Sequence, residues 1–256
     1  MVRPPQLVEF QMSTKSKCKD HIGIGAAMTS ALVQTGARKV YILGRRLDSL
    51  QNTAATIDPE GNVIIPLKCD VTDLESVSSA VKVVESNEGY IDVLINNAGI
   101  NGPRHASVYQ LETIKDVQSF LLTDYNDWEM VHAVNTCAVG GVAVAFLHLL
   151  EAGNGRRGWK TGKFADEEGA RPRSKVDGIN EDDLRTSQII TVASIAGLHR
   201  RITAGIPYAT SKIGATYLGK MLATLLAPYG IRSNVVCPGS EYSPVSLLFL
   251  LVSRDR

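Results

Sequence analysis

Short apolar runs alternate along the chain with longer stretches whose apolar residues recur at helical spacing. The runs predict strands at 39–43, 63–67, 91–96, 188–192 and 231–237. The longer stretches predict helices at 26–35, 74–86, 128–150 and 209–226. This alternation is typical of a parallel sheet covered on both faces, so it predicts an α/β fold with a doubly wound sheet.

Residues at the ends of these elements support the assignment. Gly36 follows the first predicted helix and Gly89 follows the second, where glycine ends helices readily. Asp73 precedes the second helix, where its carboxylate can cap the free N–H groups. The helices therefore have local signals for where they begin and end.

Residues 151–187 break the pattern, because they carry equal numbers of acidic and basic side chains and almost no apolar periodicity. We interpret them as a charged, solvated and mobile surface insertion within a single domain that spans residues 1–256. A binding role is the alternative, but a balanced charge run is typical of a hydrated surface.

Both ends of the chain depart from the pattern. Residues 13–21 are polar, although a buried first strand is expected before Gly23. Residues 7–12 are the candidate substitute, as a shorter strand with a long connecting loop. The C-terminal stretch 240–256 has an apolar run at 245–252 that fits an edge strand or a short helix. The sequence therefore predicts a degraded first strand and a truncated C-terminus that lacks the last strand.

The composition excludes several classes of partner. Of the 256 residues, 44% are hydrophobic, and the formal charge is +1, which gives no reason to expect nucleic acid or a membrane surface. The four cysteines are widely spaced and form no metal-binding pattern. No secretory signal is visible at 1–20. We therefore expect a soluble cytoplasmic protein with free thiols and no metal site.

Gly23, Ile24 and Gly25 precede the first predicted helix. Glycines at such a turn let the backbone approach a pyrophosphate, and the helix N-terminus supplies partial positive charge. A simple packing turn explains the two glycines equally well. The sequence therefore marks this turn as a candidate phosphate site.

Arg45 and Arg46 follow the strand at 39–43. In a doubly wound sheet an acidic residue at this place binds the ribose of NAD, whereas an arginine accommodates the 2′-phosphate of NADP. The alternative is an ordinary basic surface turn. Because both guanidinium groups are always charged, the sequence favours NADP(H) over NAD(H).

Further candidates for cofactor binding follow other predicted strands, at the edge of the sheet where such folds bind ligands. Small residues there let a cofactor lie against the backbone, and a carboxylate can bind the adenine edge. The candidates are Asp70, Val71, Asn97, Ala98, Gly99, Pro238 and Gly239.

Tyr208 and Lys212 are four residues apart in a predicted helix, so their side chains share a face. A nearby positive charge favours the phenolate, which brings the phenol towards acid/base work at neutral pH. Ser194 can hydrogen-bond a substrate oxygen on which charge changes. A surface Tyr and Lys on an ordinary amphipathic helix is the alternative.

These motifs stand in the order and at the spacing of a known family. They are Gly23-x-Gly25, Asp70-Val71, Asn96-Asn97-Ala98-Gly99, Asn135, Ser194, Tyr208-x-x-x-Lys212 and Pro238-Gly239. The chain resembles the short-chain dehydrogenase/reductase family over residues 23–239, apart from the insertion. Two departures are Cys18 and Lys19, which replace the first two residues of the family's glycine loop.

The resemblance implies a Rossmann-type fold and hydride transfer between a nicotinamide cofactor and a small carbonyl or alcohol. Tyr208 would be the general acid/base, Lys212 would lower its pKa and bind the nicotinamide ribose, and Ser194 would hold the substrate oxygen. Asn135 would anchor a proton-relay water. The resemblance also implies a homodimer through the helices at 128–150 and 209–226.

Two functions follow from these observations. The first is an NADP(H)-dependent carbonyl reductase or alcohol dehydrogenase, based on Asn135, Ser194, Tyr208 and Lys212. The second is a catalytically impaired relative that binds nucleotides or partners, or the product of altered splicing or an incorrect gene model. It is based on the altered glycine loop and the irregular C-terminus.

Overall fold

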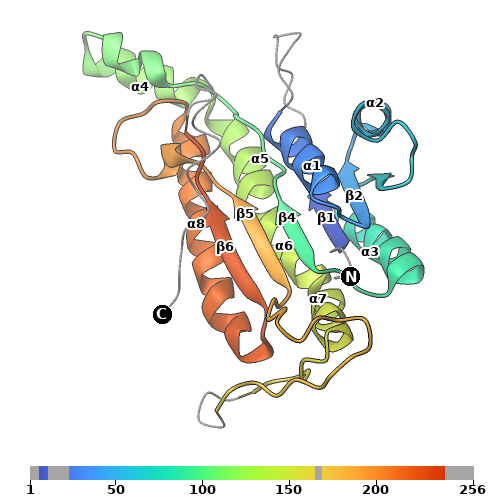
Figure 1. The fold of residues 1–256 in the computed structure, drawn as a ribbon. Helices are drawn as coiled ribbons and strands as arrows, with labels where there is room; N and C mark the ends of the chain where they lie inside the picture. Colours follow the sequence, from blue (N-terminus) through green and yellow to red (C-terminus); the bar gives the residue numbers. More distant parts are fainter. Residues whose placement is uncertain (1–5, 11–22, 165–168, 240–256) are drawn as a thin grey trace.

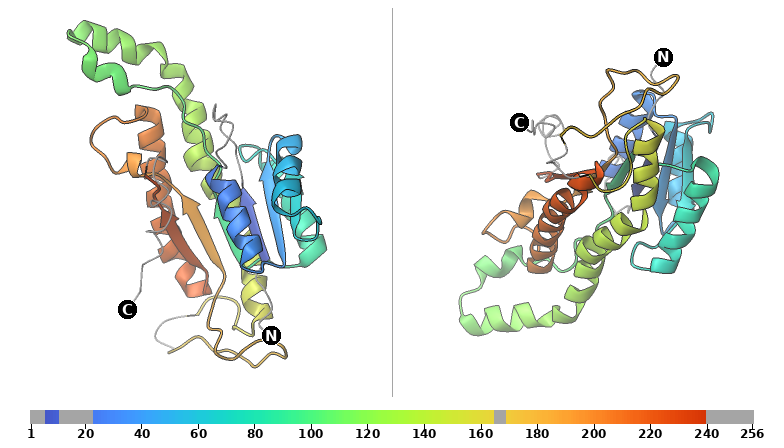
Figure 2. Two further views of the ribbon diagram at one scale, coloured as in Figure 1. Left: turned by 45° about the horizontal axis from the view of Figure 1, so that its top comes forward. Right: turned by 90° about the horizontal axis from the view of Figure 1, so that it is seen from below.

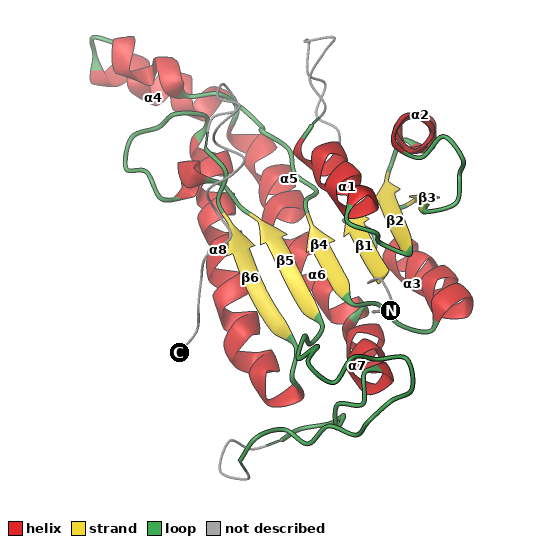
Figure 3. Cartoon of the chain, viewed as in Figure 1, coloured by secondary structure: helices red, strands yellow, loops and turns green. Residues whose placement is uncertain are grey.

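The computed structural model describes residues 6–10, 23–164 and 169–239 (Figure 1). The expectations for Cys18 and Lys19 and for the tail at 240–256 lie outside the described residues. Among those described, one sheet is flanked by helices on both faces, as the cartoon in Figure 3 shows.

The sheet has six parallel strands in the order β3-β2-β1-β4-β5-β6. Their bounds are β1 Gln6–Phe10, β2 Lys39–Gly44, β3 Ile64–Lys68, β4 Val93–Asn96, β5 Gln188–Val192 and β6 Arg232–Val236. The substitute first strand is confirmed, because β1 pairs with both β2 and β4. The strand order therefore reverses beside β1, and such folds bind ligands at the carboxyl ends of the strands around that point.

The helices bear out the predicted alternation. Their bounds are α1 Ile24–Gln34, α2 Leu47–Ile57, α3 Leu74–Glu88, α4 Ile114–Thr123, α5 Trp128–His132, α6 Ala138–Ala145, α7 Leu147–Arg156 and α8 Ile206–Leu226. Figure 2 shows them on both sides of the sheet. The α/β doubly wound fold is therefore confirmed.

Strand β2 shows why the sheet is covered twice. Tyr41 and Leu43 belong to a core that α3, α6, α7 and α8 share, while Val40 and Ile42 belong to a second core with residues of α1 and α2. Successive side chains of a strand point to opposite faces. An apolar run without alternation therefore needs a helical layer on each side.

The predicted helix ends are also confirmed. The Asp73 carboxylate accepts a hydrogen bond from the Glu75 N–H at 2.9 Å. Gly36 and Gly89 have φ values of 85° and 73°, in the region that favours glycine.

Three helical features differ from the prediction. Helices α2 and α4 were not expected. Helix α2 buries Leu50, whereas α4 buries no residue and leaves Ile114 and Leu122 exposed. The single helix expected at 128–150 is interrupted by a π-helical turn, Ala133–Cys137, and ends at Phe146. Helix α7 then continues to Arg156, inside the expected insertion.

The insertion is docked on the protein, which corrects the interpretation of 151–187 as a merely solvated surface. Arg171 donates hydrogen bonds to the carbonyl oxygens of Lys160 and Gly162, and to that of Pro228 beyond α8. Arg157 is only 3% exposed and pairs with buried Asp92 at 3.0 Å. The insertion is held by hydrogen bonds and ion pairs of charged side chains. Such contacts leave no apolar periodicity in the sequence, so the pattern did not reveal this packing.

No single helix among the described residues has the length and apolar composition to cross a bilayer. One bent pair, Tyr125–Ala145 with Leu147–Arg156, reaches those limits together, by length and composition only.

Candidate active site

The predicted catalytic residues meet around the carboxyl ends of β4 and β5. Tyr208 and Lys212 lie on the first turns of α8, and the Lys212 Nζ atom is 5.9 Å from the centroid of the Tyr208 ring. The prediction that both side chains share one face of a helix is confirmed. The ammonium group therefore lies near the half-buried phenol, where its positive charge would favour the phenolate.

Lys212 is deeply buried, with 5% of its surface exposed. Its Nζ atom donates a hydrogen bond to the Val192 carbonyl oxygen at the end of β5, at 2.9 Å. Burial lowers the pKa of Lys212 to about 8, and the nearby Cys237 thiol opposes this shift. The lysine is therefore held at a fixed place, with its charge sensitive to pH near neutrality.

Asn135 occupies the π-helical turn between α5 and α6 and is fully buried. Its Oδ1 atom accepts the Ile100 N–H at 2.8 Å, while its Nδ2 group donates to the Ile100 carbonyl oxygen at 2.9 Å and to Ser211 Oγ at 3.0 Å. A π turn is common at functional sites. The mid-helix asparagine therefore ties the segment after β4 to α8.

Gly99 lies against this pair. A Cβ atom added there would be 3.3 Å from both Asn135 Oδ1 and Lys212 Nζ. Any larger residue would crowd the amide and the ammonium group. The prediction that a small residue is needed at the end of β4 therefore has a local reason.

Ser194 follows β5 and begins a short 3-10 helix, Ile195–Gly197. Its Oγ atom accepts the Ala196 N–H at 3.2 Å, which leaves the hydroxyl proton available for donation. The next residue, Ile195, donates its N–H to the Pro238 carbonyl oxygen at 3.0 Å. The predicted cofactor-binding residues Pro238 and Gly239 therefore lie beside the segment that carries Ser194.

The other half of the predicted site surrounds the end of β2. Arg45 and Arg46 are exposed there. They line a surface cavity of about 590 Å³ together with Leu47, Asp48, Ser49, Asn52 and Lys68. Three cations around one open cavity make it suitable for an anionic group.

Asp70 and Val71 follow β3. Burial would raise the pKa of Asp70, but hydrogen bonds from the Thr72 hydroxyl and N–H, with the Arg45 charge, outweigh it and lower the pKa. The carboxylate is thus ionised and oriented, while Val71 is buried in the core.

Helix α1 begins at the predicted phosphate turn. Gly23 is its N-cap, with φ −62° and ψ 162° and no side chain to cap the helix. Ile24 follows it and Gly25 is buried in the first turn. Within the part of the chain that the structure describes, no side chain caps this end of the helix, so its first N–H groups could bind another acceptor.

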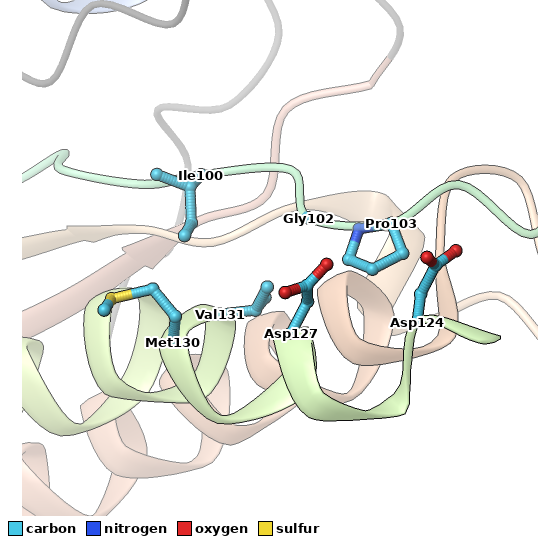
Figure 4. A pocket seen from close by; sticks show the side chains of 7 residues that line it. All are labelled: Ile100, Gly102, Pro103, Asp124, Asp127, Met130 and Val131. Carbon is cyan, nitrogen blue, oxygen red and sulfur yellow. The ribbon is translucent and has the colours of Figure 1, made fainter. Parts of the chain in front are cut away.

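A second cavity, of about 390 Å³, lies between the segment after β4 and α5 (Figure 4). It is lined by Ile100, Gly102, Pro103, Asp124, Asp127, Met130 and Val131. The sequence marked Asn97, Ala98 and Gly99, directly before the first three of these residues, as candidates for cofactor binding. It did not predict Asp124 and Asp127, because they come from a turn after the unexpected helix α4.

Comparison with known proteins identifies the family. The family model described as short chain dehydrogenase matches residues 20–158 and 181–246. The chain belongs to the short-chain dehydrogenase/reductase family. The match leaves out the middle of the insertion.

Fungal members of the family are among the similar sequences. The short-chain dehydrogenase/reductase VdtF of Byssochlamys spectabilis is 36% identical over 224 residues, which cover 85% of this chain and 69% of that protein. SAT3 of Stachybotrys chartarum is 35% identical over 233 residues, which cover 89% of this chain and 79% of that protein.

Solved structures share the fold. A short-chain dehydrogenase/reductase from Burkholderia xenovorans has a TM-score of 0.67 at 22% identity, covering 97% of this chain and 79% of that one. The NAD+-bound xylitol dehydrogenase has a TM-score of 0.63 at 22% identity, covering 93% and 71%. The Pseudomonas aeruginosa RhlG/NADP complex has a TM-score of 0.64 at 19% identity, covering 96% of this chain and 76% of that one.

Short-chain dehydrogenases/reductases use nicotinamide cofactors, and the described residues fit such a group. Gly99 leaves the backbone open beside the buried Lys212 ammonium, where a ribose hydroxyl would find a donor. The N-terminus of α1 and the exposed Arg45 and Arg46 would face its phosphate groups. A dinucleotide would therefore span from Lys212 to Arg45.

Proposed function

We propose that this short-chain dehydrogenase/reductase is an NADP(H)-dependent oxidoreductase that interconverts a small carbonyl compound and its alcohol. The observation that carries the proposal is the buried Lys212 ammonium held beside Tyr208, with Ser194 on the adjoining strand end. A lysine this deeply buried is costly unless its charge is used.

Each residue has a distinct part in the reaction. When bound, the nicotinamide supplies or accepts the hydride. In reduction, Tyr208 gives its phenolic proton to the carbonyl oxygen, and the Lys212 charge stabilises the phenolate that remains. The Ser194 hydroxyl donates a hydrogen bond to the same oxygen as negative charge develops on it. A relay water at Asn135 stays a prediction from the family resemblance.

The preference for NADP(H) is supported by charge. The structures with a similar fold include NAD-bound and NADP-bound proteins, so they do not decide between the cofactors. Arg45, Arg46 and Lys68 border one cavity, and a 2′-phosphate placed there would meet three cations.

Two measurements test the proposal. Fluorescence titration with NADPH and NADH should show tighter binding of NADPH. Turnover on a panel of carbonyl compounds, followed at the nicotinamide absorbance band, should fall by about 10²- to 10⁴-fold in Tyr208→Phe. Turnover close to that of wild type after this substitution would contradict the acid/base assignment. Tight NADPH binding without turnover would favour the nucleotide-binding alternative.

A homodimer through 128–150 and 209–226 is part of the proposal. On α8, Ile213, Tyr217, Met221 and Leu225 form an exposed apolar stripe, since residues four apart share a helix face. Met130 and Val144 are exposed on the neighbouring helices. Sedimentation should give a dimer that Met221→Glu disrupts, whereas Leu184→Glu, at an exposed apolar residue of the insertion, leaves it intact.

We also propose a cytoplasmic location. The described cysteines, Cys69, Cys137 and Cys237, are free thiols, which suits a reducing compartment. Imaging of the tagged full chain tests this, and accumulation in an oxidising compartment would contradict it.

A further inference from the structure

His105 is a fully buried residue to which the sequence assigned no role. It follows β4 by nine residues and is 0% exposed. Its ring packs edge-on against Phe120 of α4, with centroids 5.8 Å apart, and lies 6.1 Å from the Trp128 ring of α5. An apolar residue would fill such a place without the cost of burying two ring nitrogens.

The polar atoms of His105 explain why a histidine is used. Its backbone N–H donates to the Ala204 carbonyl oxygen at 2.8 Å, and its Nδ1 atom accepts the Ile206 N–H at 3.1 Å. Ile206 is the first residue of α8, the helix that carries Tyr208 two positions later. The first N–H groups of a helix have no partner within it, and the N-cap Gly205 has no side chain to offer.

Residues on either side of His105 also contact the stretch 201–205 that precedes α8. The Pro103 carbonyl oxygen packs directly on Gly205, where a Cβ atom would collide with it. The Tyr109 hydroxyl accepts the Ile202 N–H at 2.8 Å, and the Arg201 guanidinium lies 4.7 Å from the centroid of the Tyr109 ring. The chain that enters α8 is thus fixed along its length by residues 103–109.

The other end of this segment is fixed to the catalytic centre. Both backbone polar groups of Ile100 bond to the Asn135 side chain, and Ile100, Gly102 and Pro103 line the 390 Å³ cavity (Figure 4). The stretch 100–109 therefore spans from Asn135 to the first turn of α8. It links the cavity wall to the position of Tyr208.

We propose that His105 is a positioning residue that sets the place of Tyr208 by capping α8 through Nδ1. The inference rests on the proposed function. Because Nδ1 accepts a hydrogen bond, the ring proton of the neutral imidazole is on Nε2. Among the described residues Nε2 has no hydrogen-bond partner, so Nδ1 is the ring nitrogen that the fold uses.

Two amide variants test which ring nitrogen matters. In His105→Asn the Oδ1 atom takes the place of Nδ1, so the cap is kept although the side chain is smaller. In His105→Gln the amide reaches the place of Nε2 and no acceptor stands at Nδ1. We expect kcat within about threefold of wild type for Asn, and a loss of roughly 10- to 100-fold for Gln, since small misplacements of a reacting group are costly.

A merely structural role predicts the reverse order, because glutamine fills the site better than asparagine. The NADPH dissociation constant should be unchanged in both variants. In a Tyr208→Phe background, His105→Gln should lower the residual rate no further, since both substitutions act through one group. Gln at wild-type kcat, or a further loss in the double variant, would overturn the proposal.

Hydrogen exchange separates this proposal from the proposed function. The Ile206 amide should exchange at least about tenfold faster in His105→Gln than in His105→Asn or wild type, since an uncapped end frays. If the wild-type protein turns over no carbonyl compound, the proposed function is wrong. The exchange rates still test whether His105 caps α8. Equal exchange rates of the Ile206 amide in the two variants would contradict both the cap and the positioning role of His105.

Discussion

The two halves of the candidate site are built differently. In the catalytic half, around β4, β5 and α8, Asn135 is 0%, Lys212 5% and Ser194 9% exposed. In the nucleotide half, around β2 and β3, Arg45 and Arg46 are exposed on an open cavity. Groups that act on developing charge gain from being fixed in advance, whereas cations that hold a phosphate can adjust to it.

The difference in burial predicts different effects for substitutions in the two halves. Removing a buried, hydrogen-bonded group leaves its partners unsatisfied, which costs about 1–3 kcal/mol for each neutral group. Removing an exposed cation costs little stability, because water replaces its contacts. Substitutions in the catalytic half should therefore change kcat or folding, and those in the nucleotide half should change cofactor affinity.

The largest effect is expected for Tyr208→Phe. Loss of the phenolic proton should lower kcat by about 10²- to 10⁴-fold, the range for general acid/base catalysis, with little change in NADPH affinity. Tyr217→Phe is the matched control, because Tyr217 is on the same helix and 65% exposed. Steady-state kinetics of both variants decide the matter. Equal losses in the two would point to a general effect on α8.

Asn135→Ala should give the largest loss of stability. It removes the partners of the Ile100 N–H and carbonyl groups and one of the two hydrogen-bond partners of Ser211 Oγ. We expect the free energy of unfolding to fall by about 2–4 kcal/mol, measured by urea denaturation. Asn101→Ala, at an exposed residue of the same segment, should be neutral. An equally small change in both would show that the buried network is not tightly coupled.

The sequence predicted the residues of the catalytic half better than it predicted the residues that hold them in place. The spacing of Tyr208 and Lys212 fixed their shared helix face, because helical geometry is local. The hydrogen bonds of His105 join it to residues about a hundred positions away, and no periodicity encodes them. The docked insertion escaped detection for a related reason, since Arg171 and Arg157 pack through carbonyl and carboxylate partners that only the fold brings near.

Strand β1 also shows what the local sequence pattern misses. Residues 7–12 were the candidate for the first strand because a buried strand is expected before Gly23, and the structure has β1 there between β2 and β4. The pattern of residues 13–21 gave no sign of it. The expected topology therefore recovered an element that composition alone would have missed. Helix α4 was not predicted, and Ile114 and Leu122 are exposed on it.

The pH profile should report the burial of Lys212. In the proposed mechanism its charge stabilises the Tyr208 phenolate, and this charge is lost as the pH rises through the Lys212 pKa of about 8. We expect kcat/KM to fall above that pH, because this ratio reports the free enzyme. In Lys212→Arg the group stays charged, so the fall near pH 8 should disappear from whatever activity remains. A fall that is unchanged in Lys212→Arg would assign it to another group.

The same shift has the opposite sign for stability. The unfolded chain keeps the Lys212 proton up to its ordinary pKa of 10.5, while the folded chain releases it near 8. Between these values the unfolded state binds more protons, so the contribution of this group to the free energy of unfolding rises with pH. Activity and stability should therefore diverge above pH 8.

The smallest effects are expected for Arg45→Ala and Arg46→Ala. Each should raise the KM for NADPH by roughly tenfold, about 1.4 kcal/mol, while kcat stays near wild type, because the lost contact is the same in ground state and transition state. Lys82→Ala, at an exposed cation on α3, is the control. The KM for NADH should not rise in any of the three variants. A drop in kcat with unchanged KM would mean that these arginines are fixed parts of the reacting centre, and the contrast between the two halves would no longer hold.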